Sequence, residues 1–126
     1  MKFWQKIVAG PLAFKEERLK AQRKGENMET FFASFSNTQV DERLLREVYQ
    51  YFQGATLSKD FPVRYTDNID KVYGICDDDL DDAILDLANL CGYRTPTTEE
   101  VKHLKPIRTI EDLVKLLAMF RADSDQ

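Results

Sequence analysis

The stretch YGICDDDLDDAILDL, residues 73–87, decides the fold, because it threads six aspartates within ten positions through a row of apolar side chains. The apolar residues recur at i, i+4, i+7 and i+11, which is the spacing of one face of an α-helix. They are Leu80, Ile84, Leu87 and Cys91. Gly92 follows, where a helix would end. The pattern predicts an amphipathic helix over residues 78–91.

The aspartates of this helix fall into two groups. Backbone N–H groups of a first helical turn lack partners and carry partial positive charge, so Asp77, Asp78 and Asp79 are expected to cap the helix and complement its dipole. Asp78, Asp82 and Asp86, which we call the acidic ridge, stand at i, i+4 and i+8. Each neighbouring like-charged pair is destabilising by about 0.2–0.5 kcal/mol. The ridge therefore indicates either a docking surface for a basic partner or a merely solvated face.

A calcium loop would be another use of these acids. An EF-hand loop needs a glycine at its sixth position and a glutamate at its twelfth. Counted from Asp77, those positions hold Asp82 and Ala88. The sequence therefore predicts no metal site.

Upstream of this stretch we expect two helices and a long connection. A short helix over residues 29–35 carries Phe31, Phe32 and Phe35. A longer helix runs to Gly54, with Thr38 and Asp41 resembling a capping box. Its apolar stripe consists of Val40, Leu44, Val48 and Phe52, broadened by Leu45 and Tyr51. A connection as long as 55–77 is unusual unless it packs on the domain. Its expected anchors are Phe61, Val63, Tyr65, Ile69, Val72 and Ile75.

Downstream, the segment TPTTEEVKHLKPIR predicts a short helix capped by Thr97 or Thr98. Thr109 is the expected N-cap of a last helix. That helix should bury Ile110, Leu113, Val114 and Leu117. Residues 122–126 are expected to be a disordered tail. No segment alternates convincingly between apolar and polar residues, so the 126 residues predict one all-α domain.

Residues 1–27 predict a basic amphipathic arm. Residues 1–24 carry a net charge of +5, whereas residues 25–126 carry −9. The apolar residues at helical spacing, with lysines opposite, are typical of an interfacial membrane helix. These residues are Phe3, Trp4, Ile7 and Val8, with Lys2 and Lys6 on the other side. The sequence leaves open whether the arm contacts a membrane surface or a second partner, or instead packs on the domain or forms a solvated tail.

The order of these elements resembles acyl carrier proteins over residues 40–120: a first helix, a long loop, an acid-started second helix, a short third helix and a Thr-capped last helix. The run DDLDDAILDLANLCGY, residues 78–93, resembles their central Asp-Ser-Leu motif and the helix after it. Asp78, Leu80 and Asp81 match, and Tyr93 falls where carrier proteins place an aromatic residue. The segments TPTTEEVKHL and RTIEDLVKLL resemble their third and closing helices. The resemblance implies an acyl-carrier-like four-helix bundle over residues 28–121, preceded by a basic helical extension.

The sequence departs from this family at the residue that carries its chemistry. Carrier proteins attach phosphopantetheine to the serine of the central motif, and Asp79 occupies that position. A carboxylate cannot be esterified to the phosphate as serine is, and Ser34, Ser36 and Ser58 lie elsewhere in the alignment. The chain therefore resembles uncharacterised bacterial acyl-carrier-like proteins that lack the attachment serine. That resemblance implies the scaffold and its acidic recognition face without the prosthetic group.

Catalysis and membrane spanning are not expected. The chain has no nucleophile–base pair, no glycine-rich phosphate loop and a single histidine, His103. Cys76 and Cys91 lie outside any C-x-x-C pair and are expected to be free thiols in a reducing cytoplasm. No apolar run approaches the roughly 20 residues that span a bilayer. We expect a cytoplasmic protein, with a peripheral membrane location through the arm left open.

These features predict a non-catalytic adaptor domain with no cofactor. It would dock a basic protein surface through Asp78, Asp82 and Asp86, and its acidic bulk should repel nucleic acid. The alternative is a genuine acyl carrier, or an accessory subunit of fatty-acid- or polyketide-type synthesis, with an unrecognised modification site.

Overall fold

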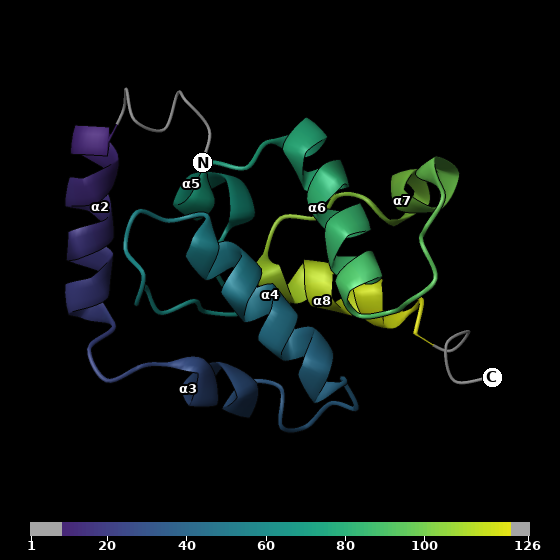
Figure 1. The fold of residues 1–126 in the computed structure, drawn as a ribbon, viewed down its shortest axis with the longest axis horizontal. Coiled ribbons are helices and arrows are strands. Elements are labelled where there is room, and N and C mark those ends of the chain that lie inside the picture. Colours follow the sequence, from purple (N-terminus) through teal and green to yellow (C-terminus); the bar gives the residue numbers. More distant parts are fainter. Residues whose placement is uncertain (1–8, 122–126) are drawn as a thin grey trace.

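The computed structural model describes residues 9–121, and this range holds seven α-helices and no β-strand. The helices are α2 (Ala9–Gln22), α3 (Met28–Ala33), α4 (Glu42–Gly54), α5 (Ile69–Tyr73), α6 (Asp77–Leu90), α7 (Thr98–Leu104) and α8 (Ile110–Ala118). Figure 1 shows α4, α6 and α8 gathered in the centre, with α2 along one side and α7 beside α6. The all-α prediction is confirmed.

The core forms where α4, α6 and α8 pack against one another. Each of the three contributes a stripe of fully buried apolar side chains at helical spacing. The buried stripes include Leu44, Val48 and Phe52 of α4, Leu80, Ile84 and Leu87 of α6, and Leu113, Val114 and Leu117 of α8. These predicted core positions are confirmed, and Tyr49 and Leu116, which the pattern did not single out, are buried with them.

The start of α4 differs from the prediction. Asp41 is its N-cap, and the Asp41 side chain accepts a hydrogen bond from the Arg43 N–H at 3.1 Å. The Thr38 hydroxyl instead donates to the Phe35 carbonyl at 2.7 Å, so the predicted capping box at Thr38 is wrong. A Thr hydroxyl competes for nearby backbone carbonyls, and here it closes the turn after α3 rather than opening α4.

The later helices begin as predicted. Thr97 and Glu100 form a capping box at α7, and Thr109 and Asp112 form another at α8. The Arg94 guanidinium binds the Glu100 carboxylate through two hydrogen bonds of 3.0 and 2.8 Å. This interaction, together with the Thr97 N–H, lowers the pKa of Glu100 to about 2.

The long connection between α4 and α6 contains the five-residue helix α5, which the sequence pattern missed because one turn shows no periodicity. Its predicted anchors are confirmed: Phe61, Val63 and Ile69 are buried, and the other three are partly buried. The connection is also hydrogen-bonded to the start of α8, because the Ile110 N–H donates to the Asp67 carbonyl at 3.1 Å. It is therefore a fixed part of the domain.

The described part of the N-terminal stretch packs on this connection. Arg23, just after α2, forms a buried ion pair with Asp67, and the two side chains are 5% and 3% exposed. The arm residues Phe3, Trp4, Ile7, Val8, Lys2 and Lys6 lie outside the described range, as does the predicted tail 122–126. Their roles stay predictions.

A matched pair of leucines on α6 tests which face of this helix is buried. Leu87 is fully buried and Leu85 is 43% exposed. We expect Leu87→Ala to lower the free energy of unfolding by about 2–5 kcal/mol, because it leaves a cavity in the core. Leu85→Ala should change it by less than about 0.5 kcal/mol. Urea denaturation of both variants measures the difference, and equal losses would contradict the fold.

Candidate protein-docking site on helix α6

The acidic ridge lies on the solvent side of α6, as the sequence predicted. Asp78 and Asp86 are exposed and Asp82 lies between them on the same face, opposite the buried stripe of the helix. Their carboxylates form no ion pair with any residue in the described range. Within that range, no cation pairs with the three negative charges on this helix face.

The first turn of α6 corrects the predicted capping. Cys76 is the N-cap, and its side chain forms no capping hydrogen bond with the helix. Asp77, Asp78 and Asp79 lie in the first turn, where they complement the helix dipole without acting as caps. The Cys76 thiol lies 3.7 Å from Oδ2 of Asp79.

The side of α6 that faces α7 has a cation partner within the domain, which neutralises part of its charge. The Lys105 ammonium lies 3.1 Å from Asp81 and 3.9 Å from Asp77. The aspartates of α6 therefore form two groups. Asp77 and Asp81 lie near Lys105, whereas the acidic ridge has no cation partner among the described residues. This division could not be read from the sequence, because Lys105 lies beyond α7.

Helix α4 borders the ridge on its other side. Arg43, near the start of α4, donates a 2.8 Å hydrogen bond to the carbonyl of Leu90 at the end of α6, so the two packed helices run antiparallel. Tyr51 comes eight residues after Arg43, and at 1.5 Å per residue it lies opposite Asp82. Partial burial, and then the charges of Asp86, Asp82 and Asp79, raise the pKa of Tyr51 above its ordinary value. Tyr51 is thus an aromatic neighbour of the ridge as well as part of the stripe.

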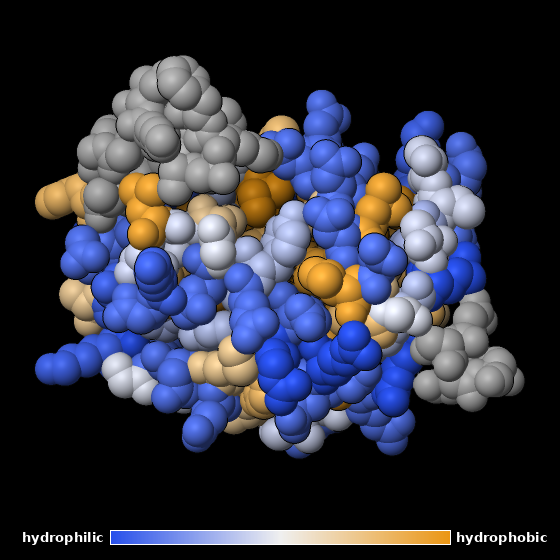
Figure 2. Space-filling view, in the orientation of Figure 1, coloured by the Kyte–Doolittle hydropathy of each residue, from blue (hydrophilic) through white to orange (hydrophobic). Residues whose placement is uncertain are grey.

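One apolar side chain interrupts the acidic face. Leu85 lies three residues after Asp82, on the same side of α6, and also lines a cavity of about 160 Å³ between α6 and α7. Pro96 and Val101 supply other apolar walls of this cavity, and Lys102 and Lys105 lie at its edge. Figure 2 shows apolar patches among hydrophilic surface on the face where α6 and α7 lie. The exposure of Leu85 could have been predicted from the sequence, because this residue lies outside the apolar stripe of Leu80, Ile84, Leu87 and Cys91.

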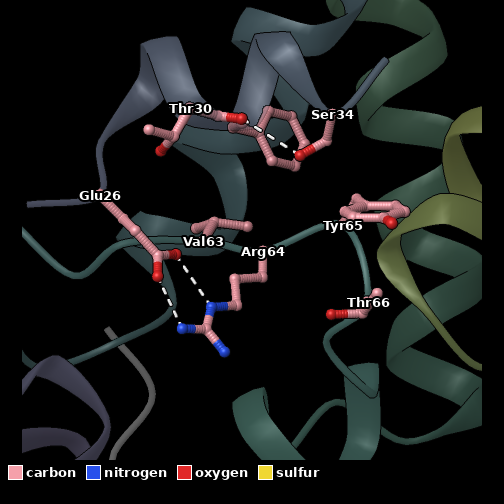
Figure 3. A pocket seen from close by; sticks show the side chains of 8 residues that line it. Glu26, Thr30, Ser34, Val63, Arg64, Tyr65 and Thr66 are labelled. Atoms are coloured by element: carbon pink, nitrogen blue, oxygen red, sulfur yellow. Dashed lines mark hydrogen bonds and ion pairs between the residues drawn. The ribbon is translucent and has the colours of Figure 1, made fainter. Parts of the chain in front are cut away.

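A second hollow, of about 270 Å³, lies between α3 and the connection (Figure 3). Its walls carry Glu26 and Arg64, which bind each other through hydrogen bonds of 2.9 and 2.6 Å. Because these two charges satisfy one another, the hollow offers no free charge of either sign from this pair. The ridge on α6 is the stronger candidate for recognition.

Metal-binding and membrane-spanning features are missing from the part of the chain that the structure describes. Among these residues, no three His, Cys, Asp or Glu side chains are grouped so that they could hold a metal ion. No described helix is long and apolar enough to cross a bilayer. Cys76 and Cys91 are both free thiols, and burial raises the pKa of Cys91 to about 11.

No protein-family model, curated protein or solved structure matches this chain. The candidate site therefore rests on the geometry of α6 and its neighbours.

Neutralising the ridge should not harm the fold. We expect Asp82→Asn with Asp86→Asn to leave the free energy of unfolding unchanged or to raise it by a few tenths of a kcal/mol, because like-charge repulsion is removed. Asp67→Asn is the matched control. It leaves Arg23 buried without its charged partner, which should cost about 3–5 kcal/mol. Thermal and urea unfolding measure both, and a clear loss in the ridge variant would show that these carboxylates stabilise the fold.

Proposed function

We propose that this protein is a non-catalytic, acyl-carrier-like adaptor that docks a basic partner surface through α6. The observation that carries the proposal is the acidic ridge, which faces solvent and has no cation partner within the described domain. Nearby acids are treated differently, since Asp77 and Asp81 share Lys105. The domain therefore leaves one acidic face open to a cation from outside.

The order and lengths of the helices support the acyl-carrier-like part of the proposal. A 13-residue α4 is followed by a long connection, a 14-residue acidic α6, a seven-residue α7 and a Thr-capped α8. Asp79 lies in the first turn of α6, at the position of the carrier serine. A carboxylate there cannot form the phosphodiester that holds phosphopantetheine. The proposal is therefore a carrier scaffold used for binding alone.

The chemistry of the ridge defines the partner. Aligned carboxylates attract Lys and Arg side chains over several ångströms, which mainly accelerates association and suppresses wrong partners. Leu85 adds an exposed apolar contact at the edge of this charged face that borders α7. A partner helix with Lys or Arg residues around one apolar side chain has the matching chemistry.

Comparative capture tests the docking surface. The full chain and its Asp82→Asn/Asp86→Asn variant are immobilised and exposed to lysate of the native cells. We expect a protein with a basic surface to be retained by the wild type and lost by the variant. In stopped-flow measurements with that protein, the variant should associate about tenfold or more slowly at low salt, with a flatter salt dependence.

Leu85→Ala is the second arm of this experiment. It should raise the dissociation rate and leave the salt dependence of association unchanged, because it removes an apolar contact and no charge. Glu99→Gln on the neighbouring α7 is a control for loss of one exposed charge. If the ridge variant and the wild type retain the same proteins with equal rates, α6 is not the docking surface.

The intact mass of the protein tests the absence of a prosthetic arm. After co-expression with a broad-specificity phosphopantetheinyl transferase, we expect the unmodified mass, because Asp79 offers no hydroxyl. A normal acyl carrier protein in the same cells is the control for transferase activity. A mass gain of one phosphopantetheine, on any residue, would replace the adaptor proposal with a genuine carrier function.

A further inference from the structure

Over residues 14–22 of α2, where the structure describes the side chains, polar groups make most of the contacts with the domain. The Glu16 carboxylate is buried and accepts hydrogen bonds from the backbone N–H groups of Leu57, at 2.9 and 3.0 Å, and Ser58, at 3.1 Å. Consecutive N–H groups that converge in this way form a small anion-binding concavity. No other acceptor for these two N–H groups lies within the described range. Glu16 therefore acts as a latch between α2 and the connection.

The other described contacts of the helix near this latch involve exposed groups. The Lys15 ammonium donates a hydrogen bond to the Lys71 carbonyl of α5 at the surface, and this bond also breaks when the helix detaches. Lys20 pairs with Asp60 at 2.9 Å, but the Asp60 side chain is 79% exposed. Leu19 is partly buried against the core, whereas Phe14 is 73% exposed. Among residues 14–22, whose side chains the structure describes, the exposed ion pair contributes little and Leu19 is the apolar side chain that packs on the core, so Glu16 makes the most deeply buried polar contact of this part of α2.

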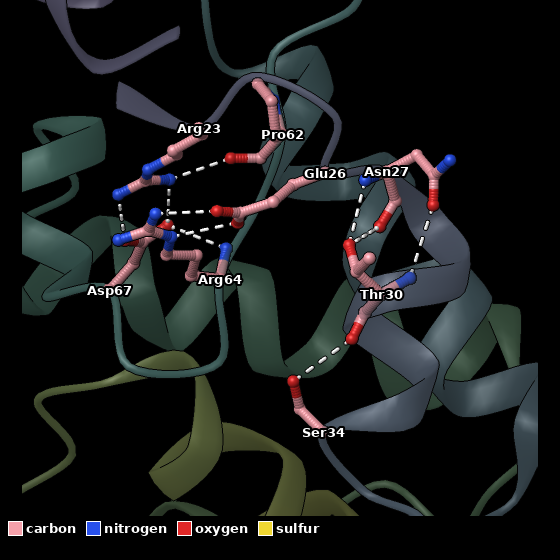
Figure 4. Close-up of polar contacts among 8 residues, drawn as sticks. All are labelled: Arg23, Glu26, Asn27, Thr30, Ser34, Pro62, Arg64 and Asp67. Carbon is pink, nitrogen blue, oxygen red and sulfur yellow. Dashed lines mark hydrogen bonds and ion pairs between the residues drawn. The ribbon is translucent and has the colours of Figure 1, made fainter. Parts of the chain in front are cut away.

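The base of the helix is fixed in another way. Arg23 binds Asp67 in a bidentate ion pair and donates a 2.7 Å hydrogen bond to the Pro62 carbonyl, as Figure 4 shows. Its guanidinium lies 5.3 Å from the centre of the Phe61 ring. Glu26, on the far side of Gly25, is bound to Arg64. Breaking a buried charge pair is costly, so this end should stay closed when the other end opens.

We propose that α2 is a strap, latched by Glu16 and pinned by Arg23, which detaches from the connection without unfolding of the domain. Detachment exposes the Leu57 and Ser58 N–H groups and the Glu16 carboxylate to water at the same moment. Water then satisfies all three groups, so opening leaves no buried polar atom unpaired at the latch. The three-helix core and the Arg23–Asp67 pair stay intact.

Opening would change the reach of the N-terminus. Fourteen residues of α2 precede the pin, and a helix of that length spans about 21 Å. The closed strap holds the start of α2 beside the domain, and the open strap releases it to contact a surface at that distance. The strap is a built-in means of extending the N-terminal end while α6 stays folded.

Hydrogen exchange of the full chain, followed residue by residue by NMR, tests the strap. In the wild type we expect the Leu57 and Ser58 amides to exchange through a local opening, well ahead of core amides such as Leu113. Glu16→Gln keeps one acceptor oxygen but loses the charge, so it should accelerate exchange at these two amides by about tenfold. The amides of α8 should be unaffected.

Glu17→Gln is the matched control, since Glu17 is exposed and adjacent, and the substitution removes the same charge. It should leave exchange at both amides unchanged. Two results would overturn the proposal. One is that the Leu57 and Ser58 amides exchange only with the core, and the other is that Glu16→Gln and Glu17→Gln have equal effects.

Discussion

A single buried carboxylate, that of Asp67, joins segments that are far apart in the sequence. It accepts hydrogen bonds from Arg23, from the Arg64 N–H and from the Tyr73 hydroxyl. Its backbone carbonyl accepts another from Ile110, at the start of α8. A carboxylate removed from water must have such partners or it destabilises the fold by several kcal/mol. The positions of α2, the connection and α5 depend on satisfying this carboxylate, and the backbone carbonyl of the same residue holds the start of α8.

The carboxylates of the acidic ridge on α6 differ from Asp67 in having no cation partner within the described domain. Asp67 is surrounded by donors, Asp81 has Lys105, and Asp41 accepts from Tyr93 and Arg43. The carboxylates of the acidic ridge have no cation among their described surroundings. Three carboxylates without a described cation partner on one helix face form a charge pattern that folding of the domain does not need. This pattern supports the proposed recognition of an external cation.

Periodicity allowed the helices and the core to be predicted, because helix formers at 3.6-residue spacing show which face is buried. Capping was predicted where Thr is followed by Glu or Asp directly at a helix start, as at Thr97 and Thr109. The capping prediction was wrong at Thr38, because the Thr38 hydroxyl donates to the Phe35 carbonyl in the turn after α3 and does not cap α4. The Arg23–Asp67 pair was not predicted, since 44 residues separate its members and only tertiary packing brings them together. For the same reason, the burial of Glu16 left no sequence signal.

The contacts that link α2 to α6 explain why these two helices can act separately. Tyr73 donates to Asp67 at 2.7 Å and lies at the end of α5, three residues before the Cys76 N-cap of α6. The position of α6 therefore depends on Asp67 and Tyr73, and Arg23 keeps Asp67 neutralised whether the latch at Glu16 is open or closed. Detachment of α2 as far as Arg23 would leave each of these contacts in place. The ridge could then hold one partner while the N-terminal end reaches for another surface, because the pin isolates the two events.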